Sequence, residues 1–275
     1  MLLANKLVAS ELLARNVPVL YRVHPSPDEK KLNSFILFAR NFGHKASFGS
    51  PPRAKFISDF ILSLRGKDEQ ELLNELLIRS MQKAFYDPEN IGHFGLAFAT
   101  YLHFTSPIRR YPDLVVHRIL KQVLNGEYQH SRGGALKASL TRIGKHCSEQ
   151  EIVIMGAERE TLAVKQAEYL SRQLGEVYEG VISGMLKFGF FVRIVDVGAE
   201  GLVRLSTLED DFYVADVERY VVVGKNSQRK FHLGDKVRVQ IVNVDLQSGE
   251  IDLYLVEDRK RSRSQKVPQK RRRRR

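Results

Sequence analysis

The residues best suited to chemistry lie in one short stretch of the chain, HFTSPIRRYPDLVVHR, which covers residues 103–118. Arg109 and Arg110 are adjacent in it and lie between Pro107 and Pro112. An arginine fork can bind two phosphate oxygens at once and stays charged while negative charge develops. Because the prolines restrict the backbone on both sides, the guanidinium is held in place. The stretch predicts a phosphate-binding site, and a basic turn before a helix is the alternative.

The polar neighbours of Arg109 extend this prediction. His103, Thr105 and Ser106 carry groups that can reach ribose hydroxyls or a phosphate. For Arg110, a contact with substrate and a surface ion pair are equal alternatives. These four residues, together with Arg109, form the candidate site of the first half of the chain.

Another histidine, His117, is expected to have a structural role. It lies one helical turn after Asp113, and we expect it to be a satisfied structural histidine, with a proton donor as the alternative. Asp113 lies near the predicted start of that helix, where a carboxylate offsets the helix dipole. His146 and Cys147 are followed by no further residues at metal-ligand spacing, so no zinc site is predicted.

The elements that must position these residues are mostly helical over residues 1–174. Ser26 as N-cap, Pro27 at the first helical position and Glu29 completing a capping box predict a helix that ends at Gly43. Apolar spacing predicts three more helices, over 68–84, 112–126 and 136–174.

From residue 175 onward the apolar period changes to that of strands. Five short runs show it, at 177–183, 190–195, 202–205, 236–241 and 251–255. A turn is predicted over 247–250. Five short strands in this length favour a small closed barrel of the OB type. The predicted fold is therefore α+β and multidomain, with a helical part, a five-stranded barrel and a basic tail.

Aromatic and basic residues gather at one turn of the predicted barrel. Strand alternation buries only one of Phe190 and Phe191, and Phe188 lies in the turn. Exposed rings can stack on bases while basic side chains neutralise phosphates. The predicted RNA-binding residues are Lys187, Phe188, Phe191, Arg193 and Arg204. A purely structural role for the rings is an equal alternative.

Composition limits the setting of the chain. Its 275 residues carry a net charge of +12, of which residues 257–275 supply +9. We expect the tail to be disordered and to attract nucleic acid, with a solubilising tail as the alternative. Cys147 is the only cysteine, and no apolar run is long enough to cross a bilayer. These features predict a cytoplasmic protein.

The barrel sequence is similar to a known RNA-binding module. GVISGMLKFGFFVRI, EGLVRLSTL and LGDKVRVQIVNVDLQSGEIDLYL resemble the S1 RNA-binding domain over its whole length. The resemblance implies that the ligand-facing aromatics are Phe188 and Phe191. Arg204 stands where a histidine is often found, which keeps a phosphate or base contact at that position.

The first half of the chain resembles the ribonuclease II/ribonuclease R family. MLLAN, LYRVHPSPDEKKL, NIGHFGLAFATYLHFTSPIRRYPDLVVHR, HCS and AERE match the C-terminal part of its RNB catalytic domain in order and spacing. The resemblance implies a 3′–5′ exoribonuclease that hydrolyses single-stranded RNA to nucleoside monophosphates, with a metal-activated water. It makes Arg109 the catalytic phosphate clamp and places Glu158 near the substrate channel. A solvated helix face is the equal alternative for Glu158.

The resemblance also shows what the chain lacks. The family holds Mg²⁺ with a cluster of aspartates that would lie upstream of Met1, and no such cluster is predicted here. We therefore expect an N-terminally truncated chain that is inactive alone, or one that works beside a second chain supplying the missing half. The alternative is a non-catalytic single-stranded RNA-binding protein. The expected domains are the catalytic portion 1–174, the S1 domain 175–257 and the tail 258–275.

Overall fold

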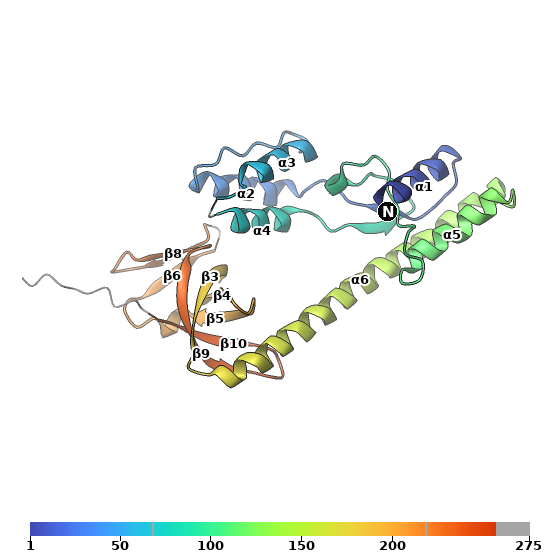
Figure 1. Ribbon diagram of the computed structural model, residues 1–275. Coiled ribbons are helices and arrows are strands. Elements are labelled where there is room, and N and C mark those ends of the chain that lie inside the picture. Colours follow the sequence, from blue (N-terminus) through green and yellow to red (C-terminus); the bar gives the residue numbers. More distant parts are fainter. Residues whose placement is uncertain (68, 218, 257–275) are drawn as a thin grey trace, which may run out of the picture. The chain divides into compact units, whose positions relative to one another are not determined.

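The computed structural model describes residues 1–67, 69–217 and 219–256 (Figure 1). The described residues form two compact units, which divide between Leu162 and Ala163. The predicted disordered tail, 258–275, lies outside the described residues. Within the described ranges, no helix combines the length and the apolar run that a bilayer crossing needs.

The first unit is mainly helical, as expected. Its helices are α1 Leu2–Ala14, α2 Glu29–Asn41, α3 Ala54–Ser63, α4 Gln70–Ser80, α5 Tyr111–Leu124 and α6 Gly133–Leu170, of which α6 continues into the second unit. Two short strands, β1 Tyr21–Val23 and β2 Phe85–Asp87, pair in antiparallel fashion. Single 3₁₀ turns lie at Phe94–Leu96 and His130–Arg132.

The start of α2 differs from the prediction. The N-cap is Asp28, whose carboxylate accepts from the backbone N–H of Lys31 at 3.0 Å, and not Ser26. The carbonyl of Ser26 instead accepts from the side-chain amide of Gln82 at 2.8 Å, so this residue belongs to the loop before the helix. The end was predicted correctly, because α2 stops before Gly43, which has a φ of +78°.

The helix predicted over 68–84 is shorter in the structure, since α4 ends at Ser80 and residues 85–87 pair with β1. By contrast, α5 starts and ends where Pro112 and Gly126 predicted. The long helix predicted over 136–174 corresponds to α6. Sequence periodicity did not reveal α1 or α3.

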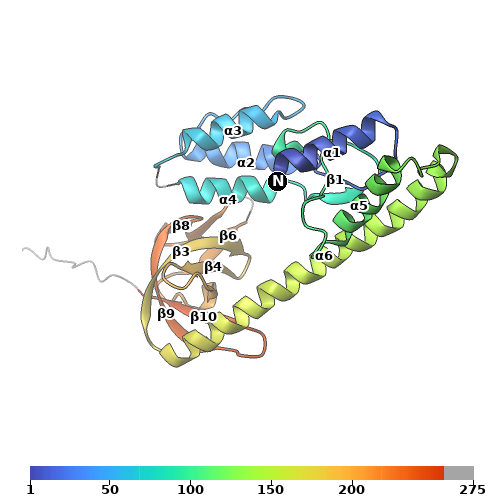
Figure 2. The same cartoon turned by 45° about the vertical axis from the view of Figure 1, so that its right-hand side comes forward.

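The core of the first unit forms where α1, the strand pair, α5 and the start of α6 meet (Figure 2). Its fully buried side chains include Leu12, Val19, Leu102, Val116 and Leu140. These residues come from both ends of the unit, so the loop between β2 and α5 is attached to a packed scaffold on each side.

The second unit contains the predicted barrel. Its strands are β3 Val177–Leu186, β4 Gly189–Ile194, β5 Glu200–Arg204, β9 Lys236–Val244 and β10 Ile251–Leu255. They close in the order β10-β5-β4-β3-β9, with β10 and β5 parallel and the other pairs antiparallel. Phe190, Ile182 and Val239 are fully buried inside it. The predicted fold class is confirmed.

A second small sheet, which the sequence did not reveal, lies between β5 and β9 in the chain. It consists of β6 Tyr213–Asp216, β7 Val221–Gly224 and β8 Lys230–His232. The sequences of β6, YVAD, and β7, VVVG, do not alternate apolar and polar residues, and β8 has only three residues. Phe231 of β8 packs on Phe190 of the barrel with ring centroids 5.5 Å apart. Further 3₁₀ turns lie at Ser171–Gln173 and Leu205–Thr207.

Candidate nucleic-acid interface

Arg109 lies in a tight turn directly before α5. The backbone N–H groups of Arg109 and Arg110 both donate to the carbonyl of Ser106, at 3.3 and 3.1 Å. The Arg109 side chain is exposed. Across the described ranges, no hydrogen bond or ion pair joins its guanidinium to another residue. This arginine can therefore meet an anion from solvent without first breaking an internal contact.

Arg110 has a different environment from its neighbour. Its guanidinium donates to Oδ1 of Asp113 at 2.8 Å, and the Asp113 side chain is fully buried. The same Oδ1 accepts from the backbone N–H of Ser106 at 2.8 Å. The two adjacent arginines therefore differ in their availability to a ligand, because Arg109 is exposed and Arg110 is paired with a buried carboxylate. Of the roles weighed for Arg110, the geometry favours an internal ion pair.

His103 belongs to a polar network behind this turn. Its Nδ1 lies 2.8 Å from the hydroxyl of Tyr86, which also donates to Glu151 at 3.3 Å. Arg22 pairs with Glu151 at 2.6 Å and lies over the Tyr86 ring. Burial, with the nearby charges of Arg110 and Arg22, lowers the pKa of His103 to about 4. The imidazole is therefore neutral at pH 7.

Glu151 is a member of this network that sequence reasoning missed. Glu158, the predicted residue, is exposed on α6 and lies seven residues further on, about 10 Å along the helix. The signal for Glu151 was a stripe at i, i+4 and i+7, formed by Gly144, Ser148 and Glu151. All three face Tyr86, since Ser148 accepts its backbone N–H at 3.0 Å and a Cβ at Gly144 would lie 2.6 Å from its carbonyl oxygen.

Thr105 and Ser106 are half-buried beside the turn. The segment that leads into them is held separately, because Asn5 accepts from the backbone N–H of Phe104 at 3.1 Å. His117 donates to the carbonyl of Phe104 at 2.9 Å and stacks on its ring at 4.1 Å. These contacts fit the structural role expected for His117.

The barrel presents the predicted aromatic and basic residues along β4 and β5. Phe188 is 56% exposed in the turn before β4, beside exposed Lys187, whereas Phe190 is fully buried. Phe191 is half-buried, and its ring lies over Gly184, where a Cβ would approach it to 3.4 Å. The predicted alternation of Phe190 and Phe191 is confirmed.

The two arginines of this face have acidic partners. Arg193 pairs with Glu200 at 3.1 Å, and Arg204 pairs with Asp252 at 3.3 Å. Exposed ion pairs of this kind contribute little stability. A phosphate can therefore take the place of the Asp252 carboxylate at Arg204 at small cost.

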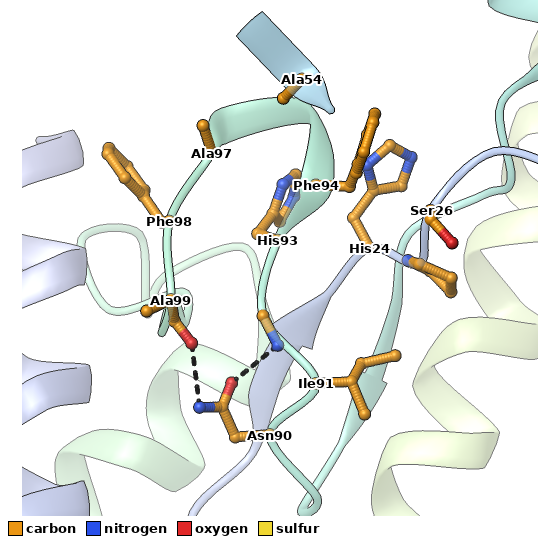
Figure 3. A pocket seen from close by; sticks show the side chains of 12 residues that line it. His24, Ser26, Ala54, Asn90, Ile91, His93, Phe94, Ala97, Phe98 and Ala99 are labelled. Atoms are coloured by element: carbon orange, nitrogen blue, oxygen red, sulfur yellow. Dashed lines mark hydrogen bonds between the residues drawn. The ribbon is translucent and has the colours of Figure 1, made fainter. Parts of the chain in front are cut away.

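A hollow in the first unit is lined by His24, His93, Phe94 and Phe98 (Figure 3). Its imidazoles are engaged with backbone, because His24 accepts from the N–H of Gly95 at 2.8 Å and donates to a carbonyl, and His93 accepts from a backbone N–H. Burial is the largest cause that lowers the pKa of His93 to about 4. Both rings therefore organise the loop before the Arg109 turn.

No three His, Cys, Asp or Glu side chains in the described part of the chain come together as metal ligands. The adjacent aspartates of the second unit, Asp210 and Asp211, accept hydrogen bonds from nearby side chains of the same unit instead. Asp211 accepts from Asn226 and Ser227, and these hydrogen bonds, led by that of the Ser227 hydroxyl, lower its pKa. Asp210 accepts from the Tyr213 hydroxyl at 2.7 Å. Burial raises the pKa of the Cys147 thiol.

Comparison with known proteins finds a different family in each half of the chain. Residues 1–126 match the family model of the RNB domain, and residues 172–255 match that of the S1 RNA binding domain. Ribonuclease R of Aquifex aeolicus is 40% identical over 260 residues, which cover 94% of this chain and 36% of that protein. Ribonuclease R of Escherichia coli is 35% identical over 271 residues, which cover 96% of this chain and 33% of that protein.

Among solved structures, RNase R of Mycoplasma genitalium in complex with ribose-methylated single-stranded RNA has a TM-score of 0.88 and 31% identity. The match covers 93% of this chain and 40% of that one. The chain therefore spans about a third of the length of the curated relatives it matches. With its RNB segment followed by an S1 RNA-binding domain, the chain belongs to the ribonuclease R family.

Proposed function

We propose that this chain is the RNA-gripping part of a 3′–5′ exoribonuclease of the ribonuclease R type, which hydrolyses single-stranded RNA to nucleoside monophosphates. One observation carries the proposal. Arg109 is exposed and has no internal partner within the described ranges, while the turn that holds it is anchored to buried Asp113. An exposed arginine without an internal partner, held in a fixed turn, is suited to binding an RNA phosphate in a protein of the ribonuclease R family.

The proposed division of labour follows the two parts of the chain. Residues 1–174 bind the phosphate through Arg109, with the neutral imidazole of His103 and the hydroxyls of Thr105 and Ser106 available to ribose. Residues 175–257 bind the strand by stacking bases on Phe188 and Phe191, with Lys187, Arg193 and Arg204 near the phosphates. Such a protein would work in the cytoplasm.

Mg²⁺ is the cofactor that the family implies, and the described residues do not fit it. Hard divalent cations need several oxygen ligands, usually carboxylates. The carboxylate of Asp113, which holds the Arg109 turn, is fully buried; its Oδ1 accepts from Ser106 and Arg110, and only Oδ2 has no hydrogen-bond partner among the described residues. We therefore propose that residues 1–275 alone have little or no hydrolytic activity. Acidic residues of another polypeptide segment or a second chain would supply the metal site.

A non-catalytic single-stranded RNA-binding protein is the second candidate function. The lack of an acidic cluster among the described residues favours it. Both candidates predict RNA binding by residues 1–275, so binding alone does not separate them. They differ in whether Arg109 contributes to that binding, because a protein that uses only the barrel and the tail has no need of it.

The test is RNA binding and product release by the purified chain. We expect a labelled single-stranded RNA to bind, and chromatography after incubation with Mg²⁺ to show no more than traces of nucleoside monophosphates. Replacement of Arg109 by glutamine should weaken binding. Binding that is unchanged in Arg109→Gln would favour the non-catalytic candidate. Rapid release of monophosphates would contradict the proposal that residues 1–275 alone have little or no hydrolytic activity.

A further inference from the structure

Asp113 is a fully buried carboxylate directly behind the Arg109 turn. It lies in the first turn of α5, three residues after the N-cap Arg110. The partial positive charge of a helix N-terminus stabilises a carboxylate there. That effect alone does not compensate for complete burial, which costs several kcal/mol for an unpaired ion. The donors that surround the carboxylate therefore decide its role.

Both donors of this carboxylate come from the ends of a single turn. Oδ1 of Asp113 accepts from the backbone N–H of Ser106 and from the guanidinium of Arg110, each at 2.8 Å. Ser106 and Arg110 are the residues on either side of the segment that contains Arg109. The carbonyl of Ser106 also accepts from the N–H groups of Arg109 and Arg110. The backbone of Arg109 cannot turn away without breaking one of these bonds.

The neighbouring segment does not depend on this carboxylate. Phe104 is held through its N–H by Asn5 and through its carbonyl by His117. A change at Asp113 therefore acts on residues 106–110 and leaves the preceding residues anchored. This separation gives Asp113 a local effect that can be measured at Arg109.

We propose that Asp113 is a positioning residue for Arg109, whose carboxylate fixes the turn that presents the Arg109 guanidinium to an RNA phosphate. Asp113 does not contact RNA itself. It acts through the Ser106 N–H and through Arg110, which neutralises it and so leaves Arg109 as the cation that faces solvent. The inference rests on the proposed function.

The test is the salt dependence of RNA binding by residues 1–275. Anisotropy of a 5′-fluorescein single-stranded oligoadenylate is measured across a salt series for the unchanged chain, Arg109→Gln, Asp113→Asn and the double variant. Each phosphate contact contributes about 0.7 to the slope of log Kd against log salt for single strands. We expect each single variant to lose about 0.7 of slope and to bind roughly tenfold more weakly. The double variant should bind like Arg109→Gln.

A purely structural role gives a different result. Asp113→Asn would then lower the unfolding temperature but keep the slope and Kd of the unchanged chain below that temperature, which would overturn the proposal. Additive losses in the double variant would overturn it as well. Asp28→Asn is the matched control, because it also changes a helix-start aspartate of the first unit, and it should leave binding unchanged.

Two further outcomes are distinguishable. If Arg109→Gln itself leaves slope and Kd unchanged, the proposed function fails and not only the role of Asp113. If Asp113→Asn does not fold, Arg110→Lys replaces it, since lysine still neutralises Asp113 but lacks the planar fork. We expect Arg110→Lys to lose slope in the same direction with a smaller change in Kd. Unchanged binding by a folded Arg110→Lys variant would overturn the proposal.

Discussion

Phe188 and Phe190 are close in sequence and opposite in environment, which allows RNA binding to be separated from stability. Phe188 is 56% exposed, whereas Phe190 is fully buried and packs on Phe231. Truncation of each to alanine is therefore expected to affect a different property of the protein.

The expected magnitudes follow from the two environments. Full burial of a phenylalanine side chain contributes about 1.5–3 kcal/mol. Less than half of Phe188 is covered, so Phe188→Ala should cost about 1 kcal/mol of unfolding free energy or less. Stacking of one base contributes about 1–3 kcal/mol, so the same variant should raise Kd about 5- to 150-fold. Phe190→Ala should cost about 3–5 kcal/mol of unfolding free energy, because it leaves a cavity in the barrel.

The assay combines urea unfolding with anisotropy of a labelled single-stranded RNA at one fixed salt concentration. Phe212→Ala is the matched control, since Phe212 is 63% exposed in the same unit but precedes the small sheet β6–β8. It should change neither property by much. Binding by Phe188→Ala that equals that of the unchanged chain would refute the stacking role of this ring.

The remaining predictions concern stability in the first unit. Gly144→Ala should destabilise the chain by about 1–3 kcal/mol in urea unfolding, because its Cβ would lie 2.6 Å from the carbonyl oxygen of Tyr86. Gly156→Ala, with nothing within 4 Å, should instead stabilise by up to about 1 kcal/mol, and equal effects of the two changes would contradict this packing. The pKa of His103 falls from 6.5 to about 4 on folding, so the unfolded chain binds the proton more tightly. Its contribution is present above pH 6.5 and is lost as pH falls toward 4, by up to about 3 kcal/mol. Melting temperatures of His103→Gln against pH should therefore be flatter than those of the unchanged chain, and an equally steep profile would contradict the assignment. His93→Gln should flatten the profile over the same range, because its pKa is also lowered to about 4.

Local signals allowed part of this structure to be predicted from sequence. Pro112 and Gly126 mark the ends of α5 because they act on their own backbone, and the alternation of Phe190 and Phe191 follows from strand geometry alone. A short motif also singled out Arg109, whose side chain is exposed in the structure, while its role as a phosphate clamp stays a prediction. In each case the information lies within a few neighbouring residues.

Features that depend on distant contacts were not predictable in the same way. Asp28, and not Ser26, caps α2, and the backbone carbonyl of Ser26 accepts from Gln82, which is 56 residues away. The role of Glu151 depends on Tyr86, which a different part of the chain brings to α6. Asp113 was expected to offset a helix dipole, but its complete burial and its two donors appear only when the turn folds back on α5.

The central claim is that Arg109 of this chain is the phosphate clamp of an exoribonuclease site. Its most direct test is a chimera in which this chain replaces the aligned 260 residues of the Aquifex aeolicus ribonuclease R. We predict that the folded chimera releases nucleoside monophosphates from the 3′ end of single-stranded RNA with Mg²⁺. Arg109→Ala in the chimera should lower the single-turnover rate about 100-fold or more. A folded Arg109→Ala chimera that hydrolyses RNA as fast as its parent would contradict the account.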